Sequence, residues 1–405
     1  MKNHWLDLSL GEICTTQYGL SVAASENGTT PILGMRNLQE GRVVVEELSR
    51  VNLETNDIDR CCLEVGDVLF NRTNSADLVG KTAIVETPFN EKTVFASYLL
   101  RLQVDETQAL PAYVNHFLNS PQSEKRLKCM ATPGVSQFNI NATSLRNHFR
   151  IQLPSLAEQR ELTRVFDAWD LTIRQLTDLI MIKKRFKVGL LHQLLIAKRR
   201  FLEFELRPLA SLRLGEFLTF TPRPIPRPCS AYTALGLRSH GKGTFVRQVD
   251  DPSTVQMDTL FQVCNNDLIV NITFAWEGAI AIASLDDEYS FVSHRFPTFT
   301  INGSVALPEY LRHVIVAPWF VFKLGLVSPG GAGRNRVMNK RDFLKIAVPL
   351  PEIDEQNRIA SLLNGLNEEL SLLNRQLELL KLQKKGLMQK LLTGQVRVKL
   401  PKGAK

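Results

Sequence analysis

The sequence predicts a mixed α/β (α+β) fold, with two globular domains separated by an antiparallel coiled coil of two long helices in a pseudo-twofold internal repeat. Three observations predict it. The phrase LPSLAEQR at 153–160 returns as LPEIDEQN at 350–357, a heptad pattern follows each copy, and charge is distributed oppositely along the two heptad stretches. The chain of 405 residues, 44% of them hydrophobic, is long enough to bury two or three cores.

The repeat extends beyond that phrase. The same shift of 197 residues carries Leu110-Pro111-x-Tyr113 onto Leu307-Pro308-x-Tyr310 without a gap. Further upstream the offset changes slightly, as in GDVLFNRT at 66–73 against NDLIVNIT at 266–273. Because the N-terminal parts of the copies have diverged more than the rest, we expect the two domains to recognise different targets.

These boundaries divide the chain into five segments. We expect a first globular domain at 1–152, a central long helix at 153–200, a second globular domain at 201–349, a C-terminal long helix at 350–398 and a basic tail at 399–405.

Both long helices carry apolar side chains at alternating intervals of three and four residues, the spacing of a coiled-coil seam. Each helix should run for about 40 residues, or about 60 Å. Ser155 with Glu158 predicts a capping box at the first helix start, and Gly394 predicts the end of the second helix. Such helices can also pack on their own domains, but the strict spacing favours mutual pairing. The seam residues are Leu162, Phe166, Trp169, Ile173, Leu176, Ile180, Leu363, Leu366, Leu370, Leu373, Leu377 and Leu380.

Charge selects the direction of pairing. Residues 155–182 have a net charge of −2 and residues 183–200 of +7, whereas residues 352–380 have −4 and residues 381–405 have +8. Parallel helices would set acid beside acid, and antiparallel helices set each basic end beside an acidic start. We therefore expect an antiparallel pair that holds the two domains about 60 Å apart.

Composition excludes several classes of protein. No segment offers the ~18 uncharged apolar residues of a membrane helix, and no leader is evident, so a cytoplasmic protein is expected. The six cysteines form no C-x-x-C pair and read as reduced thiols, and no metal site is expected. The segment 75–82, SADLVGKT, ends like a phosphate-binding loop, but the strand-like KTAIVE replaces the helix that such a loop needs. No catalytic motif is present, so no catalytic residue and no cofactor is assigned to this chain.

Two polar segments in each copy are candidates for contact with DNA. One follows an apolar strand near 70 or 270, and the other contains glycines near 134 or 331. Arginine, asparagine and glutamine make paired hydrogen bonds with base edges. The alternative is that these segments are solvent-exposed turns that bind nothing. Isolated basic residues are weaker candidates for contact with DNA, and examples are Arg36, Lys81, Arg238, Lys242 and Arg295. The candidates are Asn71, Arg72, Thr73, Asn74, Ser136, Gln137, Asn139, Asn271, Thr273, Arg334, Asn335 and Arg336.

The net charge of +8 does not reside in the globular domains. Subtracting the +7 and +8 of the two basic helix ends leaves −7 for everything else. Since phosphate contacts dominate affinity for DNA, these domains should hold DNA weakly unless a partner protein contributes.

With these features, the chain resembles the DNA specificity subunits of type I restriction-modification systems. The resemblance covers nearly the whole sequence and depends on VGDVLFNRT at 65–73, the repeated LPSLAEQR and LPEIDEQN, and KKGLMQKLLTGQVRV at 384–398. The first copy departs from the last phrase, with LLIAKRRF in place of LLTGQVRV, which leaves the end of its helix uncertain.

The resemblance implies a non-catalytic subunit with two target recognition domains, each reading one half of an asymmetric bipartite site in double-stranded DNA. The coiled coil would set the spacer between the halves. Two modification (methyltransferase) subunits would dock on the helices and bring S-adenosylmethionine. It is left open whether two restriction subunits, which use ATP and Mg, join them. Each domain would resemble the DNA-reading domain of amino-methyltransferases.

Two other classes of function remain. A coiled-coil scaffold with two protein-binding domains would need no nucleic acid, but the polar, glycine-containing loops favour DNA. A self-contained enzyme is disfavoured by the absent motifs. The sequence leaves open the bases of each half-site and the length of the spacer.

Overall fold

The chain divides into two compact units. The computed structural model describes residues 5–330 and 336–400. Unit 1 comprises Met1–Thr177 and Arg375–Lys405, and unit 2 comprises Asp178–Asn374. The division falls inside the two longest helices, α6 (Leu156–Leu195) and α10 (Ile353–Leu392), which have 40 residues each, as the heptad pattern predicted.

Both units are built on the same antiparallel sheet. The strand order β2-β11-β7-β9 in unit 1 corresponds to β16-β24-β21-β22 in unit 2. The register also agrees, because Val68 pairs with Leu102 and Leu268 pairs with Phe299. The repeat seen in the sequence is therefore a repeat of topology. The strands are β2 (Cys14–Tyr18), β7 (Val68–Asn71), β9 (Thr82–Ile84), β11 (Leu99–Val104), β16 (Leu218–Phe220), β21 (Leu268–Val270), β22 (Ile280–Ile282) and β24 (Thr298–Ile301).

A second strand pair is also common to both units. It joins the start of the globular part to the strand that leads into the long helix. In unit 1, β1 (Leu6–Ser9) pairs antiparallel with β14 (Arg150–Leu153). In unit 2, β15 (Ala210–Arg213) pairs in the same way with β25 (Ala347–Leu350).

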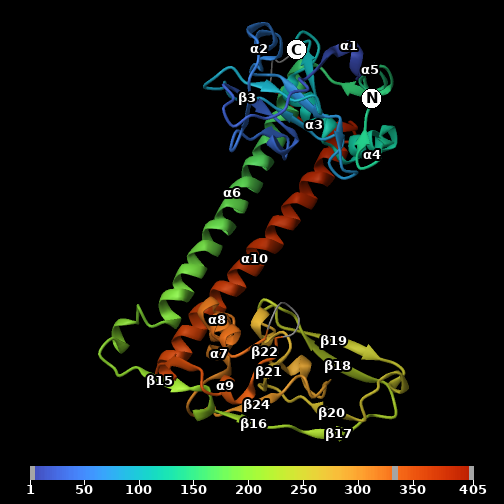
Figure 1. The fold of residues 1–405 in the computed structure, drawn as a ribbon. Helices are drawn as coiled ribbons and strands as arrows, with labels where there is room; N and C mark the ends of the chain where they lie inside the picture. Colours follow the sequence, from blue (N-terminus) through green and yellow to red (C-terminus); the bar gives the residue numbers. More distant parts are fainter. Residues whose placement is uncertain (1–4, 331–335, 401–405) are drawn as a thin grey trace. The chain divides into compact units, whose positions relative to one another are not determined.

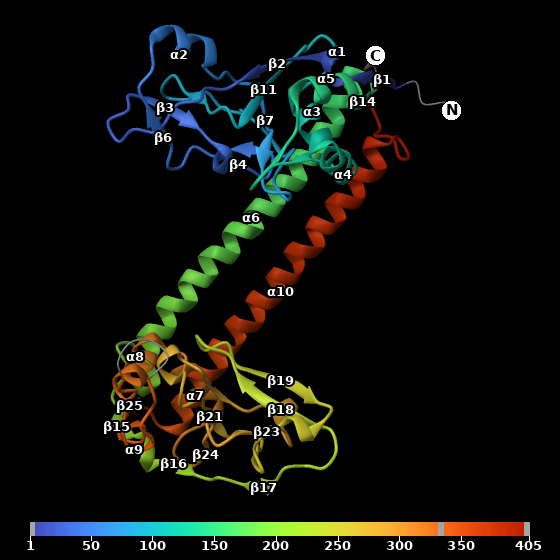
Figure 2. The ribbon, with the colours of Figure 1, turned by 45° about the vertical axis from the view of Figure 1, so that its right-hand side comes forward.

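The remaining strands differ between the units, in the regions where the sequences have diverged (Figures 1 and 2). Unit 1 extends its main sheet and adds two three-stranded sheets, whereas unit 2 has a separate five-stranded sheet in the order β17-β20-β23-β18-β19. The unit 1 elements are β3 (Thr30–Leu33), β4 (Leu38–Gln39), β5 (Arg42–Val43), β6 (Ser49–Val51), α2 (Thr55–Cys61) and β10 (Val94–Phe95). The unit 2 strands are β17 (Pro224–Pro226), β18 (Tyr232–Leu237), β19 (Thr244–Val249), β20 (Thr259–Gln262) and β23 (Phe291–Val292).

Short helices pack on these sheets in corresponding positions. Pro111 and Pro308 occupy the first turn of α3 and α7, where a missing N–H costs nothing. Tyr113 and Tyr310, two residues later, are fully buried. The short helices are α1 (Leu10–Ile13), α3 (Pro111–Leu118), α4 (Pro121–Met130), α5 (Ala142–His148), α7 (Pro308–Val314), α8 (Pro318–Leu326) and α9 (Lys340–Phe343).

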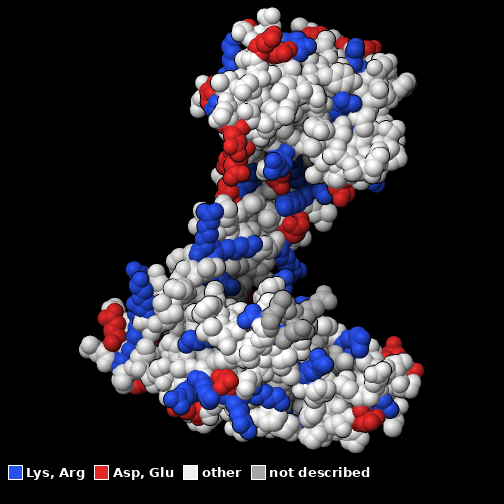
Figure 3. All heavy atoms as spheres, in the orientation of Figure 1, with Lys and Arg blue, Asp and Glu red and all other residues white. Residues whose placement is uncertain are grey.

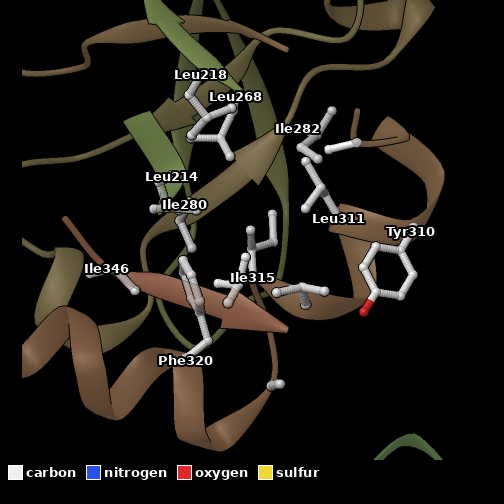
Figure 4. Close-up of a cluster of buried hydrophobic side chains, with 14 of the residues drawn as sticks. Leu214, Leu218, Leu268, Ile280, Ile282, Tyr310, Leu311, Ile315, Phe320 and Ile346 are labelled. Carbon is white, nitrogen blue, oxygen red and sulfur yellow. The ribbon is translucent and has the colours of Figure 1, made fainter. Parts of the chain in front are cut away.

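Each hydrophobic core includes residues from both long helices. In unit 2 the core contains Leu195, near the end of α6, together with Leu363, in the early part of α10. Figure 4 shows strand and short-helix side chains of this core, such as Ile280 of β22 and Phe320 of α8. In unit 1 the core contains Phe166 of α6 together with Leu391 of α10. The long helices therefore pack on the globular parts at their ends as well as on each other.

Antiparallel pairing of the helices is confirmed inside each unit, and Figure 1 shows their segments side by side there. In unit 1, Lys384 Nζ lies 2.5 Å from a carboxylate oxygen of Asp170. In unit 2, Lys183 Nζ lies 2.7 Å from a carboxylate oxygen of Glu369. These ion pairs join basic helix ends to acidic helix starts, as the charge distribution predicted.

The seam residues face inward in both units. Leu162, Phe166 and Leu363 are fully buried, and the other nine residues of the seam are buried or half-buried. Other apolar residues of the same helices, among them Leu171 and Ile182, are exposed. The helix surface therefore has an inner apolar face and a second, outer one.

The repeated Glu-Gln of the two long-helix starts has a structural role that the sequence did not reveal. In both units the glutamine amide closes the turn before a short helix: Gln159 Oε1 accepts from Leu110 N at 2.8 Å, and Gln356 Oε1 accepts from Leu307 N at 2.8 Å. The glutamate preceding each glutamine is almost fully buried.

The predicted capping box is only half present. Ser155 Oγ accepts from the Glu158 N–H at 3.3 Å, as expected. The Glu158 carboxylate does not complete the box, because it accepts hydrogen bonds from Trp5 and Arg397 instead. In unit 2 the equivalent Glu355 pairs with Arg200 at 2.6 Å, and Arg200 and Arg397 are themselves 197 positions apart. The two units thus repeat the same buried ion pair.

Candidate nucleic-acid interface

The structure brings the two polar segments of unit 1 together. Strand β8 (Thr73–Asn74) pairs with β13 (Phe138–Asn139), which pairs in turn with β12 (Thr132–Pro133). Thr73 Oγ1 donates to Asn139 Oδ1 at 2.9 Å, and the Ile140 N–H donates to the Arg72 carbonyl at 2.8 Å. Two segments more than 60 residues apart therefore form one polar surface.

The candidates in this surface differ in exposure. Asn71 is only 2% exposed, because it is the last residue of β7 and pairs with Leu99 of β11. Ser136 is exposed, and the other candidates of the unit are half-buried: Arg72, Thr73, Asn74, Gln137 and Asn139. Asn71 is thus placed to support the loop, and the remaining six can reach a ligand.

Two tyrosines that sequence reasoning missed flank Arg72. The Arg72 guanidinium carbon lies 4.9 Å from the centroid of the Tyr18 ring, and the Arg72 N–H donates to the Tyr98 carbonyl at 3.1 Å. Tyr18 is 49% exposed and Tyr98 is 47% exposed, which is unusual for such large side chains. A cation over an aromatic face is attracted by the ring, so Tyr18 restricts the positions open to Arg72. No local pattern in the sequence distinguishes these tyrosines from core residues.

Unit 2 makes a corresponding backbone contact beside its first polar loop. The Met338 N–H donates to the Ile272 carbonyl at 2.8 Å, the counterpart of the Ile140 and Arg72 contact. Asn271 Oδ1 accepts from the Thr273 N–H at 3.0 Å, which fixes a turn after β21. The candidates Arg334 and Asn335 lie outside the described residues.

Arg336 is engaged by its own unit. Its guanidinium donates to the carbonyls of Ser328 and Gly325, each at 3.2 Å, and its central carbon lies 5.4 Å from the centroid of the Trp276 ring. These contacts hold the chain after α8 against the turn that contains Trp276. Contact of Arg336 with a base would compete with them.

An aspartate anchors the turn before the strand that leads into each polar loop. Asp67 accepts from the Glu64 N–H and Asp267 from the Cys264 N–H, both at 2.9 Å. Burial raises the pKa of Asp67, while the Glu64 N–H and Arg101 act in the opposite direction. In unit 2, Arg223 pairs with Asp267 through two hydrogen bonds. These contacts account for the aspartate shared by GDVLFNRT and NDLIVNIT.

Across residues 5–330 and 336–400, no cluster of three or more histidine, cysteine, aspartate or glutamate side chains could hold a metal ion. None of the helices in this described part is long and apolar enough to cross a membrane. The cysteines are free thiols. After the segment that resembled a phosphate loop, the chain enters strand β9, as expected from its sequence.

Comparison with known proteins identifies relatives, although no family model matches the chain. The chain is 25% identical, over 91% of its length and 88% of the relative, to the MjaX specificity subunit assigned to a type I restriction enzyme of Methanocaldococcus jannaschii. It is 27% identical over 148 residues to the specificity subunit of the type I enzyme EcoKI of Escherichia coli, covering 36% of this chain and 32% of the relative.

Solved structures share the fold. A specificity (S) subunit of a type I restriction-modification system from M. genitalium matches with a TM-score of 0.55 and 12% identity, over 96% of both chains. A chain from a study of complex assembly and conformational transition in a type I system matches with a TM-score of 0.61 and 16% identity, over 98% of this chain and 99% of that one. Together with the sequence relatives, these matches confirm the resemblance that the repeated motifs indicated: over nearly its whole length, the chain is similar to the specificity subunits of type I restriction-modification systems.

Proposed function

We propose that this chain selects the DNA sequence on which a type I restriction-modification complex acts, with each unit reading one half of an asymmetric bipartite site. The observation that carries the proposal is the pairing of two polar segments in both units. In unit 1 the pairing joins Ile140 to Arg72, and in unit 2 it joins Met338 to Ile272. A reading surface built twice by one chain fits a site with two halves.

The side chains of the unit 1 surface suit direct reading of bases. Arg72 can donate two parallel hydrogen bonds to a guanine, and Asn74 and Gln137 can pair with an adenine. The corresponding surface of unit 2 has isoleucine at 272 where unit 1 has arginine at 72. Because the reading residues differ, the two half-sites should differ in sequence.

The outer apolar residues of the long helices support docking of two methyltransferase subunits. In unit 1 these residues include Leu171 of α6 and Leu382 of α10, and in unit 2 they include Ile182 and Phe186 of α6 and Leu372 of α10. Exposed apolar side chains in this number mark a protein interface. The helices would also set the spacer between the half-sites.

The chemistry would belong to these partners. The methyltransferase subunits would bring S-adenosylmethionine, and restriction subunits with ATP and Mg would join in a complex that also cleaves DNA. This chain would contribute no catalytic residue. With a charge of −7 outside its basic helix ends, it would depend on the partners for most contacts with phosphate, in the cytoplasm where its DNA lies.

Methylation mapping tests this function. The chain is co-expressed with its methyltransferase subunit in cells that lack other adenine methylation, and modified adenines are located by single-molecule sequencing. We expect one bipartite, asymmetric motif with a spacer of fixed length. Methylation without sequence preference would support the scaffold alternative and contradict the proposal. Methyl transfer or strand cleavage by the purified chain alone would contradict the non-catalytic role.

Substitutions in unit 1 provide the residue-level test. Arg72→Ala should relax or abolish recognition in one half of the motif and leave the other half unchanged. Arg60→Ala is the matched control, because Arg60 is an exposed arginine of α2 whose partner is Asp57 within the same helix. If Arg72→Ala leaves the whole motif unchanged, Arg72 is not a reading residue.

A further inference from the structure

A pocket opens on unit 2 between its four-stranded and five-stranded sheets. Segment 221–223 connects β16 to β17, segment 293–297 connects β23 to β24, and α9 lies at the rim. The space inside amounts to about 300 Å³, part of it open to solvent. The lining consists of Phe220, Pro222, Phe261, His294, Phe296, Pro297, Thr298 and Lys340.

The walls of this pocket are held by contacts within the unit. Arg223 pairs with the buried Asp267 at 2.6 and 3.1 Å and so fixes the first connecting segment. Thr298 Oγ1 donates to the Thr221 carbonyl at 2.8 Å, which joins the two segments. The Phe220 ring rests against Phe299, with 5.7 Å between the ring centroids. The pocket is therefore formed before any ligand arrives.

Its position connects it to both polar segments of unit 2. The Ile272 N–H donates to the Arg295 carbonyl at 3.0 Å, so the segment that lines the pocket also supports the first polar loop. Lys340 begins α9, four residues after the second polar segment ends at Arg336. Figure 3 shows Lys and Arg side chains gathered over α9 and β16. A DNA strand in contact with the first polar loop and with Arg336 would pass this pocket.

The chemistry of the lining suits a flat aromatic ligand that carries negative charge. Three phenylalanines line the pocket, and Lys340 Nζ lies over the Phe220 ring, 4.8 Å from its centroid. The lining contains no carboxylate that would repel an anion. Aromatic faces hold bases of any identity by stacking, and a lysine beside them can bind the attached phosphate.

We propose that this pocket holds one nucleobase that leaves the stack of the half-site read by unit 2, with Lys340 on its phosphate. The inference rests on the proposed function. Unstacking has an energetic cost that is smallest where stacking and pairing are weak. The pocket would therefore add a preference for a deformable step beside the bases that the polar loops read.

An abasic-site walk tests the inference in the complex of the full chain with its methyltransferase subunits. Duplexes carry the mapped site, and each nucleotide of the half-site assigned to unit 2 is replaced in turn by an abasic nucleotide. At one position, base removal should weaken binding by about tenfold, because stacking on the phenylalanines is lost. In the Phe220→Ala complex, removal of that same base should have little further effect. The methyltransferase can itself extrude a base, but removal of that base should affect the parent complex and the Phe220→Ala complex equally. The dependence on Phe220 therefore identifies the base that enters the pocket.

Two further variants complete the design. Phe322→Ala is the matched control, because Phe322 is 67% exposed on α8 and lies outside the lining, and it should leave the walk unchanged. Phe220→Leu keeps the apolar volume but removes the ring face, so it should show the same coupling if Phe220→Ala does not fold. If the complex binds its site, but the effect of base removal is the same with and without Phe220 at every position, then the pocket holds no base and the proposed function still stands. A complex that selects no bipartite site would overturn the proposed function as well.

Discussion

Arg72 shows how the environment of one residue prepares it for recognition. Its backbone is held by Tyr98 and Ile140, and its guanidinium lies over Tyr18. An arginine held near its bound position loses less conformational entropy when it contacts a base. Tyr18 is therefore a positioning residue, and it would add to affinity without touching DNA.

The first prediction concerns this ring. Tyr18→Ala should weaken binding of the complex to its site about fivefold, since an exposed cation and ring contribute about 1 kcal/mol. Tyr18→Phe retains the ring face and should bind like the parent chain. Affinities measured by fluorescence anisotropy at constant salt provide the check. Equal losses in both variants would show that the hydroxyl, and not the ring, is what matters.

His313 and His116 show how equivalent residues can differ in ionisation environment. His116 Nε2 lies 2.9 Å from an Asp167 carboxylate oxygen, whereas His313 Nε2 lies 2.9 Å from the Asn364 amide oxygen. Burial lowers the pKa of His313 below its ordinary 6.5, and the positive charges of Lys187 and Arg312 act in the same direction, against the hydrogen bond to Asn364. Neutral His313 therefore contributes stability that is fully present above pH 6.5 and is lost as the pH falls below it.

The second prediction follows from this comparison. Asn364→Asp gives His313 the carboxylate partner that His116 has, and should raise the pKa of His313. An NMR titration of the His313 ring measures that pKa, and urea unfolding at pH 5.5 and 7.5 should show a smaller loss of stability in acid than in the parent chain. Asn357→Asp adds the same charge to an exposed position of α10 as a control. A pKa of His313 that stays unchanged in Asn364→Asp would contradict the argument.

At the scale of elements, the ends of the two long helices are alike in geometry and unlike in sequence. Gly394 has φ of 69° and Ala197, at the equivalent position, has φ of 52°. Both residues adopt the left-handed conformation that ends many helices. Glycine adopts it freely, but the Cβ of alanine makes it unfavourable by about 1 kcal/mol. The departure of LLIAKRRF from LLTGQVRV thus alters the energy of the helix end and leaves its conformation intact.

The third prediction tests that difference. Ala197→Gly should raise the free energy of unfolding of unit 2 by about 0.5 to 1 kcal/mol, and Gly394→Ala should lower that of unit 1 by a similar amount. Denaturant titration of the full chain, followed by hydrogen exchange in each unit, measures both. Because the two substitutions exchange the same residues at equivalent positions, effects of equal sign would contradict this explanation.

The buried ion pairs at the helix starts act at the same scale. Glu158 and Glu355 are almost fully buried, so each needs its arginine to balance a charge that water does not reach. Each arginine comes from the segment just after the C-terminal end of the other helix. The pairs therefore specify the antiparallel arrangement in each unit, because a parallel one would leave both carboxylates unpaired.

At the scale of the whole molecule, both long helices cross the boundary between the units. The proposed function assigns these helices the setting of the spacer. The boundary residues are Thr177 and Asp178 in α6 and Asn374 and Arg375 in α10, so insertions there leave both hydrophobic cores intact.

The fourth prediction uses this position. A heptad inserted into both helices at the boundary lengthens each by about 10 Å and preserves the seam. We expect the methylated motif to keep both half-sites and gain a longer spacer, or methylation to be lost if the half-sites can no longer be engaged together. Methylation mapping gives the spacer directly. The same motif with unchanged spacing would show that the helices do not set it.

How much the sequence predicts depends on how far apart the interacting residues lie in the chain. Heptads and charge runs are periodic over neighbouring residues, so helix length and pairing direction followed from Leu370, Leu377 and their equivalents alone. The partner of Glu158 was assigned wrongly, because the capping box uses a nearby backbone N–H and the observed bond reaches Arg397, 239 positions away. The sequence predicted that Asn71 lies in a polar loop. In the structure it is the last residue of β7 and is buried.

The internal repeat, the two long helices, their antiparallel direction and the resemblance to the specificity subunits can all be read from the amino-acid sequence. These follow from local periodicity, charge and repeated phrases. The hydrogen bond between Thr73 and Asn139, the position of Tyr18 under Arg72 and the shared pocket of Phe220, Phe296 and Lys340 become visible only in the folded chain. These contacts join segments that are distant in the chain, and they form because sheets and helices bury their apolar faces together.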